Sequence, residues 1–164
     1  MTLMQLAEWL ESTPAGVMVR ESAWGFPILV AIHLLGLSLS VGLLVWFDLR
    51  LLGVSMPRVR VSDVYRRLMP WTLAGFVVMF ASGGLLLAGF ATAAYGNTYF
   101  RLKVAAILLA GVNAAVYHLV TERRIAQWDA GIRPAGPARF AGLASIALWA
   151  IVILAGRMMS YTMF

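Results

Sequence analysis

The sequence predicts an all-α integral membrane protein, a four-helix bundle with a short amphipathic interfacial helix at its N-terminus. Of its 164 residues, 62% are hydrophobic and 12% are charged, whereas about a quarter are charged in soluble domains. A soluble globule of this composition would expose a large apolar surface, so the bilayer is the expected solvent. Four apolar stretches of about 20 residues can each cross a membrane at ~1.5 Å per residue. The chain is expected to form one transmembrane domain.

The predicted elements are an amphipathic helix at about 2–12 and spans at about 24–47, 69–90, 101–120 and 140–161. Apolar residues recur at helical spacing in the first element, from Leu3 to Leu10, which is typical of a helix on the membrane surface. Thr13 and Pro14 are expected to break that helix. Pro70 is expected in the first turn of the second span, where its missing amide proton is harmless.

The basic residues predict the orientation. The loops after the first and third spans hold nine of the thirteen Lys and Arg residues. The positive-inside rule therefore places these loops in the cytoplasm and both termini in the periplasm of a multi-pass bacterial inner-membrane protein. The net charge of +6 reflects this topology, and no nucleic-acid partner is expected. Asp48 and Arg50 should form a charge pair at the cytoplasmic surface that ends the first span.

His33 is the one ionisable residue inside the first span. It lies about nine residues, or ~13 Å, from the outer end, and an intramembrane histidine is a functional-site hypothesis by default. The same level falls near Ser82, Gly83 and Gly84 in the second span, near 110–111 in the third and near 151–155 in the fourth. These largely small residues either let helices approach closely or leave room for a flat macrocycle beside the histidine.

Lys103 and Arg157 are the basic residues nearest His33 at the outer side. They suit the propionates of a haem whose iron sits deeper on His33. The alternative is that they snorkel to lipid phosphates, which is the favoured interpretation for Arg101. A sixth iron ligand is left open among Lys103 and three methionines, Met79, Met158 and Met159, and a five-coordinate iron is the remaining alternative.

His118, the second histidine, lies ~25 Å from the outer face. The offset of roughly 12 Å from His33 argues against one haem held by both histidines. His118 can pair with Glu122 one turn later, or serve a second metal or a proton relay. Asn113, on the same span, is expected to hydrogen bond across helices.

The leading hypothesis is a haem b-binding membrane subunit for electron transport, with His33 as the metal ligand. Gly83, Gly84, Lys103 and Arg157 are its other expected cofactor-binding residues, and the redox partner is open. A copper or small-solute transport protein and a non-catalytic scaffold subunit are the alternatives. The chain has no cysteine and no hydrolase or phosphate-loop motif. Besides membrane lipid, a homo-oligomer or a larger membrane complex is expected, since four spans bury limited surface.

Five features follow one another along the chain, namely IHLLG in the first span, then DLRLLG, a glycine-bearing second span, FRLK and NAAVYH. Over nearly its whole length the chain resembles a family of small bacterial inner-membrane proteins of unknown function. More distantly it is similar to the four-helix membrane protoporphyrinogen oxidases and the copper-resistance D membrane proteins. In the oxidases a first-helix histidine and a third-helix lysine are functional and haem b is bound. The resemblance thus implies roles for His33 and Lys103. The first loop departs from that family, so the resemblance extends to haem binding rather than oxidase activity.

Overall fold

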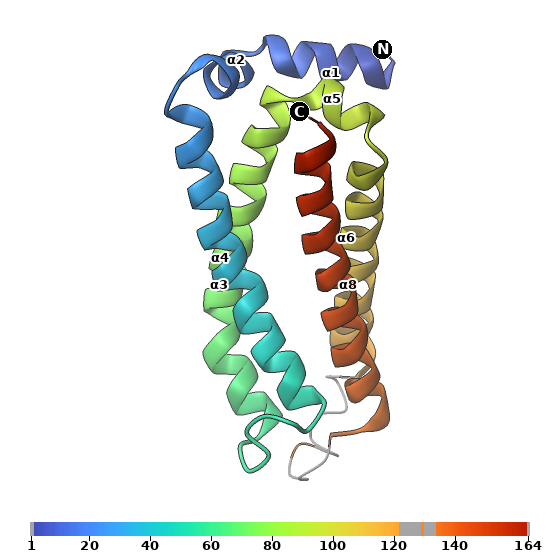
Figure 1. Ribbon diagram of the computed structural model, residues 1–164. Coiled ribbons are helices and arrows are strands. Elements are labelled where there is room, and N and C mark those ends of the chain that lie inside the picture. The colour runs from blue at the N-terminus through green and yellow to red at the C-terminus, as the bar shows by residue number, and fades with distance from the viewer. Residues whose placement is uncertain (1, 122–128, 130–133, 164) are drawn as a thin grey trace.

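The computed structural model of the protein describes residues 2–121, 129 and 134–163, and all regular structure in these residues is helical. In chain order the helices are α1 (Leu3–Ser12), α2 (Pro14–Glu21), α3 (Gly25–Leu51), α4 (Val61–Gly89), α5 (Ala91–Gly96), α6 (Thr98–Val116), the π-helical turn η1 (Tyr117–Thr121) and α8 (Gly136–Thr162) (Figure 1). Helices α3, α4, α6 with η1, and α8 are long and apolar enough to cross a membrane. The predicted four-helix membrane bundle is therefore confirmed.

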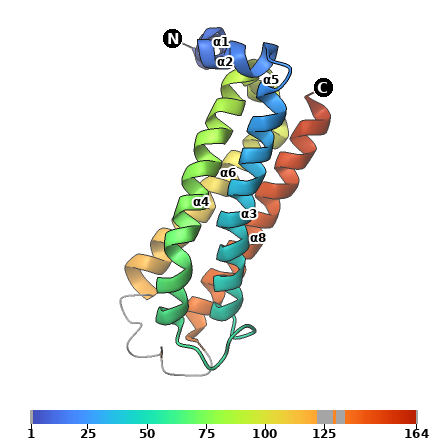
Figure 2. The ribbon, with the colours of Figure 1, turned by 90° about the vertical axis from the view of Figure 1, so that its left-hand side faces the viewer.

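The four long helices run side by side, and both chain termini lie at the same end of the bundle (Figures 1 and 2). We call this the terminal end and the opposite one the loop end. Helix α3 ends at the loop end because Gly53 adopts a φ of +79°. Its amide and that of Leu52 bond back to carbonyls of the last turn, as in a glycine C-cap.

Helix α1 lies across the terminal end of the bundle (Figure 1). Thr2 and Gln5 start it with reciprocal side-chain bonds to each other's amides, at 3.3 and 2.8 Å, which is a capping box. The Glu11 carboxylate accepts bonds from the amide and hydroxyl of Thr92 in α5, at 2.8 and 2.6 Å. The helix predicted at about 2–12 is confirmed. The predicted break at Thr13 and Pro14 is also confirmed, since α1 ends at Ser12 and Pro14 starts the separate helix α2.

Helices α3 and α4 form the closest pair in the bundle. A Cβ atom added at Gly36 would lie 2.8 Å from the amide nitrogen of Met79, and one at Gly75 would lie 2.6 Å from that of Ser40. The two backbones therefore touch, as small residues permit in lipid. The close contact fixes the register of α3 against α4.

Helices α6 and α8 form the second pair. Asn97 caps α6 by accepting bonds from the amides of Tyr99 and Phe100, and its own amide nitrogen donates to Thr162 Oγ1 at 2.8 Å. Farther along, the Asn113 amide donates to the Ala141 carbonyl at 3.0 Å, so the predicted bond across helices is confirmed. The first bond holds the start of α6 beside the end of α8, and the second holds the last part of α6 beside the start of α8.

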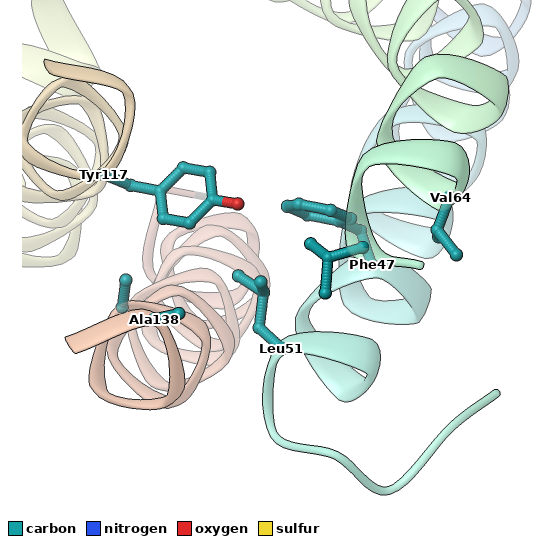
Figure 3. Close-up of a cluster of buried hydrophobic side chains, with 7 residues drawn as sticks. Phe47, Leu51, Val64, Tyr117 and Ala138 are labelled. Carbon is teal, nitrogen blue, oxygen red and sulfur yellow. The ribbon is translucent and has the colours of Figure 1, made fainter. Parts of the chain in front are cut away.

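A buried apolar cluster joins the two pairs at the loop end. Phe47 and Leu51 of α3 face Tyr117 and Ala138 (Figure 3), and the Phe47 and Tyr117 rings meet edge to face at 6.0 Å. A Cβ atom added at Gly142 of α8 would lie 3.0 Å from the carbonyl oxygen of Asp48. Helices α3 and α8 are therefore in close contact at this end.

Two predictions about the loop end are wrong. Helix α4 begins at Val61 rather than near Met69, so Pro70 lies inside the helix and not in its first turn. Asp48 and Arg50 are 3% and 1% exposed instead of lying at the surface. The Arg50 Nε donates to the Val59 carbonyl at 2.8 Å, so this arginine holds the loop after α3 against the bundle.

Candidate functional site

A cavity of about 540 Å³ lies between the four long helices in the terminal half of the bundle. Its wall is mostly aliphatic and aromatic, and α5 adds Ala94. All five residues predicted to bind a cofactor line it, namely His33 from α3, Gly83 and Gly84 from α4, Lys103 from α6, and Arg157 from α8. In α6 the cavity-lining residues lie between Phe100 and Ile107, rather than at the predicted level of 110–111.

The cavity is closed toward both ends of the bundle. Toward the loop end, Met79 and Val152 line it and pack into a buried cluster with Val41 and Trp149. Toward the terminal end, the Phe26 and Phe90 rings meet edge to face at 5.5 Å. Helices α1, α2 and α5 lie beyond them (Figure 1).

The His33 ring is held by one of its two nitrogens. Nδ1 lies 2.9 Å from the Met79 carbonyl oxygen and 3.1 Å from Ser82 Oγ. A carbonyl oxygen only accepts, so Nδ1 carries the ring proton and donates it. Nε2 then bears a free lone pair, and it forms no hydrogen bond with the described residues. A histidine that ligates a metal is commonly oriented by such a bond from its other nitrogen to a backbone carbonyl.

The two glycines beside His33 differ in what they face. A Cβ atom added at Gly83 would lie 3.0 Å from His33 Cε1, so Gly83 leaves room for the ring. One added at Gly84 would meet no atom within 4 Å, so Gly84 borders open space. The predicted small-residue layer therefore serves both interpretations, close packing at Gly83 and room for a ligand at Gly84.

Lys103 and Arg157 supply positive charge to the cavity. The Lys103 side chain lies along α8, with its Nζ 3.6 Å from the position of a Cβ at Gly156. It is partly buried and makes no ion pair with the described residues. The Arg157 guanidinium donates to the Tyr161 hydroxyl at 2.9 Å and lies 4.9 Å above the same ring. Since the described lining contains no carboxylate, the cavity favours an anionic ligand.

The structure shows which of the four residues predicted as a possible sixth iron ligand line the cavity. The Met79 sulfur lies 3.8 Å from the Ser40 hydroxyl oxygen, whose proton is donated to the Gly36 carbonyl at 2.7 Å, and the Met79 side chain is buried. Met158 does not line the cavity, whereas Met159 and Lys103 do. Met79 lines the cavity as well, so Lys103, Met79 and Met159 remain as candidates.

His118 lies away from this cavity, near the loop end of the bundle. Its ring meets those of Tyr65 and Tyr117 edge to face, at 5.7 and 5.3 Å. The pairing predicted with Glu122 lies outside the described residues. No group of three or more His, Asp or Glu side chains that could hold a metal occurs in the part of the chain that the structure describes.

Sequence reasoning missed the aromatic rim of the cavity. Phe26, Phe90 and Phe100 line its terminal end. In the sequence these three residues resemble ordinary aromatic residues of the membrane interface. They come together only in the folded chain, where the bends after α2 and α4 determine their positions. The one signal in the sequence was the position of Phe100, one residue before Arg101 and three before Lys103.

Comparison with known proteins identifies the family. A family of unknown function, DUF6644, matches residues 7–162, which include every helix that lines the cavity. No curated protein and no solved structure matches the chain. The match extends over nearly the whole protein, and the chain therefore belongs to the DUF6644 family of unknown function.

Proposed function

We propose that this protein binds haem b within the membrane and serves as an electron-transfer or redox subunit, with His33 Nε2 as an axial ligand of the iron. One observation carries the proposal. The His33 ring is fixed through Nδ1 by the Met79 carbonyl and Ser82, and the same residue lines a large apolar cavity. This is the arrangement of an oriented metal-ligating histidine.

The other lining residues fit the same group. The volume of about 540 Å³ falls within the ~300–1,000 Å³ typical of ligand and cofactor pockets. The apolar wall suits a macrocycle, and Gly84 leaves space beside His33. Lys103 and Arg157, which both line the cavity, would pair with the two propionates.

Each residue has a definite task in this proposal. Haem supplies one-electron redox chemistry, and the protein supplies ligation, orientation and a low dielectric. Met79 and Ser82 keep the proton on Nδ1, so that the lone pair stays on Nε2. The aromatic rim and the Met79–Trp149 cluster limit the access of water, and Lys103 and Arg157 offset the negative charge of the ligand.

The proposal includes a location and a topology. The two loop-end connections and the helix ends beside them carry nine of the thirteen Lys and Arg residues, which supports a bacterial inner membrane with the loop end in the cytoplasm. Both termini and the cavity then belong to the periplasmic half. The redox partner would be met in the membrane or at the periplasmic surface, within a homo-oligomer or a larger complex.

An absorption spectrum tests the proposal. The protein is produced in cells supplied with a haem precursor, purified in mild detergent, and measured in its oxidised and dithionite-reduced forms. A Soret band with sharpened reduced bands is expected, and it should be lost in His33→Ala. The matched control is His118→Ala, which removes the other histidine and should keep the spectrum.

Two results would contradict the proposal. A featureless wild-type spectrum would exclude haem and turn attention to copper, small-solute transport or a scaffold role. A spectrum that survives His33→Ala and disappears in His118→Ala would place the haem at the loop end instead.

A further inference from the structure

The cavity has no open route along the axis of the bundle. The Met79–Trp149 cluster lies between it and the loop end. At the terminal end, Ala94 of α5 is fully buried and lines the cavity, and α1 is bonded to α5 through Glu11 and Thr92. A ligand must therefore enter between two of the long helices.

Two of the four seams between neighbouring helices are sealed. Backbone contact at Gly36 and Gly75 closes the seam between α3 and α4. The seam between α6 and α8 is closed by Ala106 and Ala110, which are buried against α8, and by the Lys103 side chain over Gly156.

The seam between α3 and α8 is partly sealed and carries charge on its α8 side. These helices are in contact at Gly142 toward the loop end. At the level of the cavity Arg157 and Ser160 form its α8 edge, on the same side of α8 as Gly142 by helical periodicity, while the apolar Leu34 lines the cavity from α3. A charged edge of this kind suits the anionic end of a ligand rather than the passage of an apolar body.

The seam between α4 and α6 is apolar and is not closed by backbone contact. Among the described residues these two helices have no extensive contact with each other. Met79 and Ala106 are buried and mark the inward side of α4 and α6. Gly84 lies about 140° around α4 from Met79, and Val104 lies about 160° around α6 from Ala106. Both residues therefore lie at the edge of the cavity that faces lipid. Phe80 and Val104 are 51% and 38% exposed there, and Gly84 meets no atom beyond its position.

We propose that the slit between α4 and α6, bordered by Phe80, Gly84 and Val104, is a lateral portal through which the ligand enters from the bilayer. This inference rests on the proposed function for the identity of the ligand. The portal admits molecules that dissolve in lipid and carry an anionic end, since a flat apolar body passes the slit and Lys103 and Arg157 receive the acidic groups. Water-soluble solutes have no matching route.

The test follows loading of the full-length protein rather than any activity. Haem-free protein is reconstituted into phosphatidylcholine vesicles, haem is delivered from a second vesicle population, and the rise of the His33-dependent Soret band is timed. Gly84→Trp fills the slit and should slow loading about tenfold or more. The control Gly42→Trp adds the same side chain at another position with no atom within 4 Å and away from the cavity, and should load at the wild-type rate.

The outcomes separate this inference from the proposed function. Wild-type protein that takes up no haem overturns both. Wild-type uptake with equal rates in Gly84→Trp, or equal slowing in Gly42→Trp, overturns the portal alone. A second variant, Val104→Trp, narrows the slit from the side of α6. It tests the portal independently if Gly84→Trp does not fold. A wild-type rate in a folded Val104→Trp protein would equally contradict the portal.

Discussion

His33 of α3 and Met79 of α4 are joined by a hydrogen bond of 2.9 Å from Nδ1 to a backbone carbonyl oxygen. The bond crosses the closest helix pair in the bundle, so the ring position is set by backbone rather than by a mobile side chain. Ser82 Oγ lies 3.1 Å from the same nitrogen and donates its own proton to the Val78 carbonyl at 2.6 Å. The relationship fixes both the tautomer and the direction of His33.

Replacement of Ser82 by alanine should weaken ligand binding without unfolding the protein. Loss of an outer partner of a ligating histidine typically costs about 10–100-fold in affinity, and the Met79 carbonyl remains to hold the ring. We therefore expect the lower end of that range, measured by titrating haem into haem-free protein. An unchanged affinity would show that the carbonyl alone positions His33. Thermal unfolding of the haem-free variant serves as the control for fold.

Gly83→Ala should disturb the site much more than Gly84→Ala. The added methyl group at residue 83 would lie 3.0 Å from His33 Cε1, whereas the same group at residue 84 meets nothing within 4 Å. Both variants gain the same helix propensity. A difference in haem affinity between them therefore reports the displacement of the His33 ring. We expect at least a tenfold loss of haem affinity in Gly83→Ala and less than a twofold change in Gly84→Ala, both by the same titration. Equal effects would contradict the observed packing.

Lys103→Gln should weaken the binding of an anionic ligand, because a partly buried ammonium group is held inside the cavity with no counter-ion among the described residues. Charge-assisted bonds contribute about 1.5–3 kcal/mol, so a loss of roughly tenfold or more in haem affinity is expected. Arg101→Gln is the matched control, since Arg101 is exposed and donates to the Tyr95 carbonyl at 3.3 Å. Haem dimethyl ester lacks both free acid groups. The affinity for this ester should therefore be the same in the wild-type protein and in Lys103→Gln. Persistence of the effect with the ester would assign Lys103 a different role.

Residue counting predicted part of the site because spanning helices rise regularly along the membrane normal. Counting from the outer end of the first span places His33 level with Ser82 and Gly83, and the structure brings these residues into contact. The same counting failed in α6. That helix starts at Thr98 behind the Asn97 cap, and its cavity-lining residues come from its first three turns.

The loop end was less predictable because it depends on contacts between distant segments. A charged pair three residues before the end of an apolar span looks like a surface feature. The burial of Asp48 depends on Gly142, 94 positions later, which allows α8 to approach the Asp48 carbonyl. The rotation of α3 about its own axis could not be predicted from its sequence. This helix is apolar on all sides, so no face of it is distinguished as the one that packs against a neighbouring helix.

Gly75→Ala should destabilise the bundle, whereas Gly42→Ala should not. An added methyl group at residue 75 would lie 2.6 Å from the Ser40 amide nitrogen, and the contact is backbone that cannot rotate away. Overpacking of this kind costs about 1–3 kcal/mol, and α3 would have to move away from α4. At residue 42 the methyl group meets nothing within 4 Å, so only the gain in helix propensity of up to roughly 1 kcal/mol remains. Unfolding of the haem-free protein by increasing SDS in mixed micelles, followed by circular dichroism, should shift to lower SDS for Gly75→Ala only. The bond from His33 to Met79 joins the same helix pair, so Gly75→Ala should also lower haem affinity. A normal haem affinity in a clearly destabilised Gly75→Ala protein would show that the site does not depend on this packing.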